Sequence, residues 1–132
     1  RSLVVAGCRN LSRTEAEYAS SHGIVLVPPD AGRLDVNQLV KVMSQMPTPT
    51  YLSVDVDVLD PAWMPATGTP EPSGVTWQSL LETLTALSEV CCFAGADLVE
   101  FSPTRSHRAA DVTAASLLHT IIATVGSNMG RS

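Results

Sequence analysis

The 132-residue chain contains few cysteines and few basic residues, and only 5% of it is aromatic. Its 3 cysteines are odd in number and two of them are adjacent, so they do not indicate a disulfide framework. We interpret them as small buried residues of a protein in a reducing compartment. The 8 lysines and arginines are scattered singly, and the net charge is -5. This scatter of basic residues and the negative net charge exclude a basic surface that could follow a phosphate backbone, so we expect no nucleic-acid partner.

Long hydrophobic runs are also scarce. We expect that no stretch reaches the length needed to cross a bilayer, and the sequence does not open with a charged leader and a signal-type apolar run. The prediction is a cytoplasmic protein without a membrane partner. The chain begins with Arg1 and enters an apolar run almost at once, so we expect it to be part of a longer protein.

Short apolar runs alternate with segments of helical periodicity, and 45% hydrophobic content suits one core rather than two. Strands are predicted at residues 3–8, 24–29, 51–59 and 96–103, the first of them buried on both faces. Helices are predicted after caps at Ser12, Asp35, Thr76 and Asp111. The last helix is nearly all apolar, so most of its circumference should be covered. The alternation predicts an α/β unit with a parallel sheet and right-handed crossovers.

Two aspartates interrupt the otherwise apolar run Y-L-S-V-D-V-D-V-L. On a strand, Asp55 and Asp57 project to the same side. Aspartate is depleted in strands, and two adjacent carboxylates repel each other unless they share a proton or a cation, so the pair indicates a site for Mn, Mg or Ca. Asp60, before Pro61, is interpreted as a turn opener. A D-x-D pattern alone also occurs in phosphohydrolases and glycosyltransferases, which leaves the reaction open.

The segment that follows is rich in Pro, Gly and Thr. Residues 61–74 have the composition of a stiff loop lying over the strand ends, and Thr67 and Thr69 offer hydroxyls there. Ligands of such sheets bind beyond the carboxyl ends of the strands. Glu100, at the end of the fourth predicted strand, is therefore a third acid at the same edge. Taken alone, Glu100 would be interpreted as a solvated carboxylate or a helix cap.

Three motifs occur in order: S-V-D-V-D-V-L-D-P, P-A-T-G-T-P-E-P-S-G and D-L-V-E-F-S-P. Together they resemble the C-terminal half of the ureohydrolases, the binuclear manganese family of arginase, agmatinase and formiminoglutamase. G-C-R at residues 7–9 is similar to a Gly-x-Arg near an earlier strand of that family. The resemblance covers nearly the whole chain. It implies an arginase-like three-layer α/β sandwich with a parallel sheet, residues 1–132 being the C-terminal part of a single domain about twice as long.

The resemblance also implies roles for individual residues. Asp55 is similar to the carboxylate that bridges both metals, and Asp57 to a ligand of one of them. Glu100 is similar to the acid that pairs with the guanidinium or amidine group, and Thr69 to a hydroxyl near that group. Asp55, Asp57 and Glu100 are thereby implied as catalytic. The implied function is hydrolysis of a small guanidino compound of the agmatine or arginine type, releasing urea, with two Mn²⁺ per complete site in a homo-oligomer.

The sequence departs from the family pattern in its histidines. An earlier histidine ligand and a D-x-H-x-D motif are both missing from the 132 residues. His22, His107 and His119 stand in other contexts, and we interpret all three as packed or solvated. We therefore expect the isolated chain to be inactive and the remaining ligands to lie upstream of Arg1.

Two other functions stay open. One is a non-catalytic ureohydrolase-like subunit that lacks a complete metal site. The other is a flavodoxin-like domain that uses the D-x-D with magnesium for phosphoryl chemistry. The substrate also stays open, because T-R-S-H at residues 104–107 departs from the agmatinase-like pattern. Ser73 stands where many members of that family have glycine, a difference that we expect to alter the turn slightly.

Overall fold

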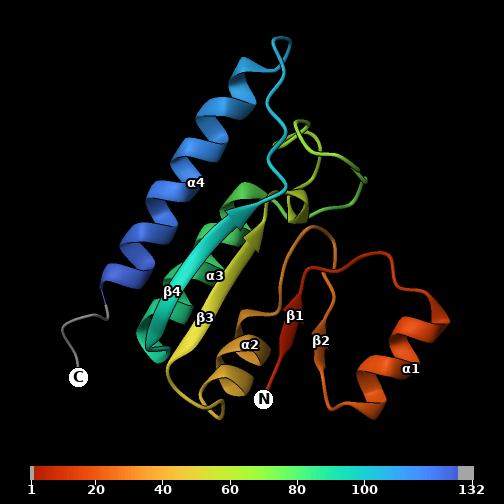
Figure 1. The fold of residues 1–132 in the computed structure, drawn as a ribbon, viewed down its shortest axis with the longest axis vertical. Helices are drawn as coiled ribbons and strands as arrows, with labels where there is room; N and C mark the ends of the chain where they lie inside the picture. The colour runs from red at the N-terminus through yellow and green to blue at the C-terminus, as the bar shows by residue number, and fades with distance from the viewer. Residues whose placement is uncertain (1, 128–132) are drawn as a thin grey trace.

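The computed structural model describes residues 2–127, in which strands and helices alternate along the chain (Figure 1). The strands are β1 (Val4–Ala6), β2 (Val25–Val27), β3 (Thr50–Asp55) and β4 (Phe93–Val99). The helices are α1 (Arg13–Ser21), α2 (Val36–Met43), α3 (Trp77–Val90) and α4 (Arg108–Gly126), with a 3-10 turn, η1 (Val56–Val58), after β3. This order confirms the predicted α/β class.

Side-chain caps define where the first three helices begin. The Ser12 hydroxyl accepts a hydrogen bond from the Glu15 amide at 3.2 Å, and the Glu15 carboxylate accepts one from the Ser12 amide at 2.8 Å. Asp35 and Thr76 each accept a hydrogen bond from the backbone amide three residues later. These bonds satisfy amide groups that a helix leaves unpaired in its first turn. The three predicted helix starts are confirmed.

Helix α4 begins earlier than predicted and is less buried. Its N-cap position is His107, which makes no side-chain cap bond, and Asp111 lies in the first helical turn. The predicted cap at Asp111 was therefore wrong, because residues 108–110 are good helix formers and extend the helix upstream. Val112 is 68% exposed and Ile122 62% exposed. The prediction that most of the circumference is covered was also wrong.

The same helix has the length and the apolar composition of a membrane-crossing segment. The expectation that no stretch reaches that length was wrong. Length and composition are the only basis for this similarity, and core helices share both properties. One side of α4 is in fact buried, and it carries Ala110, Ala114, Leu117, Ile121 and Thr124.

Two pairs of parallel strands form the sheets. In the first pair Val4 of β1 lies opposite Val25 of β2, and in the second Asp55 of β3 lies opposite Val99 of β4. Among residues 2–127 no ladder joins the two pairs, so the single predicted sheet is divided into two. All residues of β1 are only partly buried, which contradicts the prediction of burial on both faces. The parallel direction brings the ends of β3 and β4 to one edge (Figure 1).

The core lies around the β3–β4 pair. Helix α3 contacts α2 and α4, and α4 contacts β4. Helix α1 lies beside β2, on the opposite side of the molecule from α4 (Figure 1). The largest fully buried side chains include Leu39, Leu59, Met64, Leu84, Leu117 and Ile121. Leu59 follows η1 directly and Met64 comes five residues later, so buried side chains anchor the segment beyond β3 in the core.

Candidate functional site

Strand β3 ends at Asp55 because this residue caps η1. Its Oδ1 accepts a hydrogen bond from the Asp57 amide at 3.0 Å. A side chain that bonds the backbone two residues on offers the chain an alternative to the sheet ladder. Asp57 therefore lies in a 3-10 turn, and the prediction that the strand continues to residue 59 was wrong.

The turn nevertheless places Asp57 beside Asp55, and the end of β4 adds Glu100. One carboxylate oxygen from each residue can be chosen so that all three lie within 4.8 Å of one another. We call Asp55, Asp57 and Glu100 the acid cluster. Asp55 and Asp57 are half-buried, whereas Glu100 is exposed. Carboxylate oxygens at this spacing are the donor type that a hard divalent cation binds.

Glu100 has an uncommon backbone conformation. Its φ is +61°, in the left-handed region that is costly for residues other than glycine. The residues after it are fixed, because Phe101 forms a bridge with Thr67 and the Ser102 amide donates to the Ala66 carbonyl at 2.9 Å. Strained non-glycine residues concentrate at functional sites, where the surrounding structure holds them in place.

The electrostatics of the acid cluster favour a cation. Burial raises the pKa of Asp57 above its ordinary value, and the negative charge of Asp55 raises it further. The Arg9 guanidinium acts in the opposite direction, but the net direction is upward. Burial and the charge of Asp55 both disfavour the ionised form of Asp57, and a cation bound beside it would offset both effects. The donor chemistry of the acid cluster fits a divalent metal ion.

A loop of residues 61–74 adjoins the acid cluster and is closed by Asp60. The Asp60 carboxylate accepts hydrogen bonds from the Ala62 amide at 3.0 Å and from the Gly74 amide at 3.2 Å. These amides lower the pKa of Asp60. The predicted turn at Asp60 is confirmed, and the same side chain also joins the two ends of the loop.

The two threonine hydroxyls of this loop differ in environment. Thr67 Oγ1 is buried and has no hydrogen-bond partner among residues 2–127. Thr69 is exposed. The structure brings Asp55, Asp57 and Glu100 together, and Thr69 lies on the adjoining loop.

None of the three histidines joins the acid cluster in the described part of the chain. His22 is exposed, and its ring stacks on Tyr18 with centroids 3.9 Å apart. His107 lies at the start of α4, and His119 is exposed on the same helix. These positions agree with the prediction that all three are packed or solvated.

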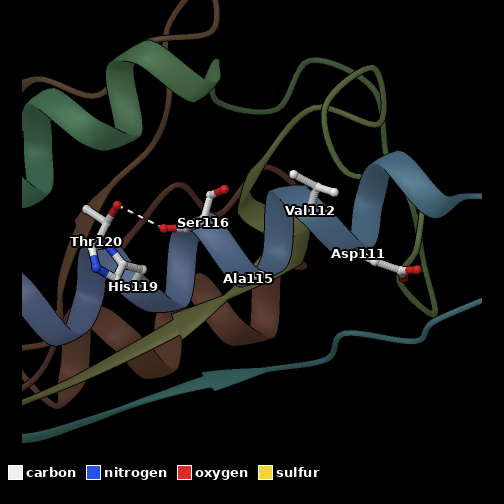
Figure 2. A pocket seen from close by; sticks show the side chains of 6 residues that line it. All are labelled: Asp111, Val112, Ala115, Ser116, His119 and Thr120. Carbon is white, nitrogen blue, oxygen red and sulfur yellow. Dashed lines mark hydrogen bonds between the residues drawn. The ribbon is translucent and has the colours of Figure 1, made fainter.

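An open hollow of about 600 Å³ lies along α4. Figure 2 shows its lining, which consists of Asp111, Val112, Ala115, Ser116, His119 and Thr120. The Thr120 hydroxyl donates to the Ser116 carbonyl at 3.0 Å within the helix (Figure 2). No member of the acid cluster lines the hollow, so the hollow and the acid cluster are two different candidate sites. The chemistry is the better guide, because the hollow is one exposed face of a helix.

Arg9, for which the sequence pattern indicated no role, contacts the segment of the acid cluster. Its Nη2 donates to the Asp57 carbonyl at 2.8 Å across 48 positions of sequence. The signal that could have identified it is G-C-R, directly after the first strand.

Comparison with known proteins connects this geometry to a family. The Arginase family model matches residues 1–124. An agmatinase of Pyrococcus horikoshii is 37% identical over an alignment that covers 91% of this chain and 42% of that protein. An N(1)-aminopropylagmatine ureohydrolase of Thermus thermophilus is 31% identical, with 97% and 43% covered. The chain thus spans less than half the length of these curated relatives.

Solved structures give the same result. The agmatine ureohydrolase of Thermoplasma volcanium matches with a TM-score of 0.77 and 30% identity, covering 95% of this chain and 42% of that one. The proclavaminate amidino hydrolase of Streptomyces clavuligerus matches with a TM-score of 0.80 and 29% identity, with the same coverage. The predicted arginase-like fold is confirmed. On its sequence and its fold, the chain belongs to the arginase family.

Proposed function

We propose that this chain is the C-terminal part of a single-domain, manganese-dependent hydrolase of a small guanidino or amidino compound. The observation that carries the proposal is the acid cluster, in which three carboxylates from β3, η1 and the end of β4 converge. Family membership supports it, and relatives named agmatinase and N(1)-aminopropylagmatine ureohydrolase indicate the substrate class. A substrate of the agmatine or arginine type would yield urea and an amine.

Each predicted site residue has a role in this proposal. Asp55 and Asp57 would hold two Mn²⁺ ions, with Asp55 as the ligand that both share. Bound metal ions would supply Lewis acidity and an activated water molecule as nucleophile. Glu100, the exposed acid, would bind the cationic guanidinium group through charge-assisted hydrogen bonds. The Thr69 hydroxyl would contact the same group.

The acid cluster is only part of a complete two-metal site. The two carboxylates of Asp55 and Asp57 supply fewer ligand atoms than two manganese ions need, because Mn²⁺ prefers octahedral oxygen coordination. The remaining ligands would come from polypeptide outside the 132 residues, and the isolated chain should be inactive. A cytoplasmic homo-oligomer belongs to the same proposal and rests on the family relationship alone.

Urea release by the complete protein tests the proposal. The protein would be stripped of metal, reloaded with Mn²⁺ and assayed with arginine, agmatine, guanidinobutyrate and formiminoglutamate, the last for formamide. We expect turnover of at least one compound, dependent on Mn²⁺, and none from residues 1–132 alone. A manganese-loaded protein that hydrolyses none of the four would contradict the proposal.

A second candidate is a non-catalytic, ureohydrolase-like subunit. The observation in its favour is that the acid cluster contains no histidine from residues 2–127. The sequence that precedes Arg1 distinguishes the two candidates. A D-x-H-x-D motif there would support the hydrolase, and a preceding sequence without that motif would support the subunit.

A further inference from the structure

Arg9 binds three backbone carbonyls that belong to two separate segments. Its Nη2 donates to the Asp57 carbonyl at 2.8 Å, and its Nη1 donates to the Val58 carbonyl at 3.1 Å. A third, longer bond of 3.4 Å joins Nη2 to the Glu71 carbonyl. One guanidinium group therefore connects the end of β1 to η1 and to the loop of residues 61–74.

The backbone before Arg9 is shaped for this contact. Gly7 has a φ of +85°, and a Cβ atom at this position would collide with Cγ2 of Val58. Glycine therefore allows the end of β1 to approach η1 closely. Asn10 adds a further bond from its Nδ2 to Glu71 Oε1 at 3.2 Å. Residues 7–10 thus hold η1 and the loop at the same time.

The carbonyls that Arg9 binds include that of Asp57 itself. The orientation of the Asp57 side chain depends on the backbone of η1, which has only three residues and a single capping bond from Asp55. The planar guanidinium can contact several acceptors in a fixed geometry, whereas a lysine ammonium is a compact charge without that geometry. The three hydrogen bonds come from the terminal nitrogens Nη1 and Nη2 of Arg9. Its Nε is buried and has no acceptor among residues 2–127.

We propose that Arg9 is a positioning residue for metal binding: it holds η1 so that the Asp57 carboxylate faces Asp55 and Glu100. This inference rests on the proposed function, because it requires the acid cluster to bind metal. Arg9 acts through the backbone of the ligand segment and touches neither metal nor substrate. Residues that orient metal ligands in this way change metal affinity when they are replaced.

Manganese affinity in the complete protein tests the inference. Arg9→Met keeps much of the side-chain length and removes all three hydrogen bonds. We expect the Mn²⁺ dissociation constant, measured by calorimetry or by the electron paramagnetic resonance of free Mn²⁺, to rise roughly 10- to 100-fold. Arg9→Lys should lie between wild type and Arg9→Met. At saturating Mn²⁺ the KM for substrate should change little, which separates this role from that of Glu100.

Arg13→Met is the matched control, because the Arg13 side chain is 92% exposed and, within residues 2–127, forms an ion pair with Glu17 alone, on the same helix. It should bind Mn²⁺ as wild type does. If Arg9→Met and wild type bind Mn²⁺ equally, the positioning role is wrong while the proposed function stands. If wild type binds no Mn²⁺, both are wrong. Should Arg9→Met fail to fold, Arg9→Lys decides the question, and a wild-type dissociation constant for that variant would overturn the inference.

Discussion

Asp60 and Gly74 are joined across the base of the loop that adjoins the acid cluster. Asp60 Oδ2 accepts a hydrogen bond from the Gly74 amide at 3.2 Å. The Asp60 amide in turn donates to the Val75 carbonyl at 3.0 Å. A Cβ on Gly74 would collide with the Asp60 backbone, so the two ends of the loop are in direct contact. The loop is therefore closed by main-chain atoms and one carboxylate.

Asp60→Asn should remove a pH-dependent part of the stability. Hydrogen bonds from the loop amides, that of Ala62 first, hold the pKa of Asp60 below its ordinary value of 3.8. A carboxyl group with a lowered folded-state pKa stabilises above its unfolded-state pKa, and this contribution is lost as pH falls through the folded-state value. The difference in unfolding free energy between wild type and Asp60→Asn should therefore shrink as pH falls below 3.8. Urea unfolding at a series of pH values measures it, and a difference independent of pH would contradict the prediction.

Ser73→Gly should stabilise the protein. Ser73 has a φ of +66°, which is costly for a residue with a Cβ atom but not for glycine. We expect the unfolding free energy to rise by about 1 kcal/mol, measured by chemical denaturation of the complete protein. Ser44→Gly is the control, because Ser44 has a φ of -64° and its hydroxyl bonds the Lys41 carbonyl. An equal effect of both substitutions would show that the backbone angle of Ser73 is not the cause.

Local signals in the sequence were sufficient for much of the fold. The caps at Ser12, Asp35 and Thr76 act over a few residues, so each can be recognised from its own segment. The start of α4 could not, because Asp111 has the residue type of a cap while the alanines before it continue the helix. A helix start is predictable only where a cap and helix propensity agree.

The acid cluster was predictable as a set of residues but not as a geometry. Alternation along a strand placed Asp55 and Asp57 on one face, whereas they meet because Asp55 turns the chain at η1. Arg9 also binds η1, from 48 positions away in the sequence. The G-C-R motif marks Arg9 in the sequence, but a binding partner 48 positions away leaves no local pattern that names it.

Asp55→Asn in the complete protein should lower the bound manganese. An amide is neutral and cannot supply the negative charge that a shared ligand of two cations provides. Manganese content after dialysis, measured by atomic absorption, should fall below that of wild type. Asp97→Asn is a suitable control, because Asp97 lies within β4, bonds Tyr51 and is outside the acid cluster. A full manganese load in Asp55→Asn would remove Asp55 from the site.

Glu100→Gln should separate substrate binding from metal binding. Glu100 is the exposed member of the acid cluster, and its charge would pair with the guanidinium group. We expect KM to rise by at least about tenfold, since loss of a charge-assisted hydrogen bond costs on the order of 1.5–3 kcal/mol, while manganese stays bound. Steady-state kinetics and metal analysis on the same preparation measure both quantities. Unchanged kinetics, or loss of the metal, would contradict the assigned role.

Thr67→Val should stabilise the protein, because the Thr67 hydroxyl is buried without a hydrogen-bond partner among residues 2–127. Valine has nearly the same shape and removes the unsatisfied polar atom, so the unfolding free energy should rise by about 1 kcal/mol. Thr83→Val is the matched control, because the buried Thr83 hydroxyl donates to the Ser79 carbonyl at 2.8 Å. That variant should lose about 1 kcal/mol instead. Chemical denaturation of both variants decides the matter: a loss of stability in Thr67→Val would mean that the hydroxyl has a partner in the complete protein.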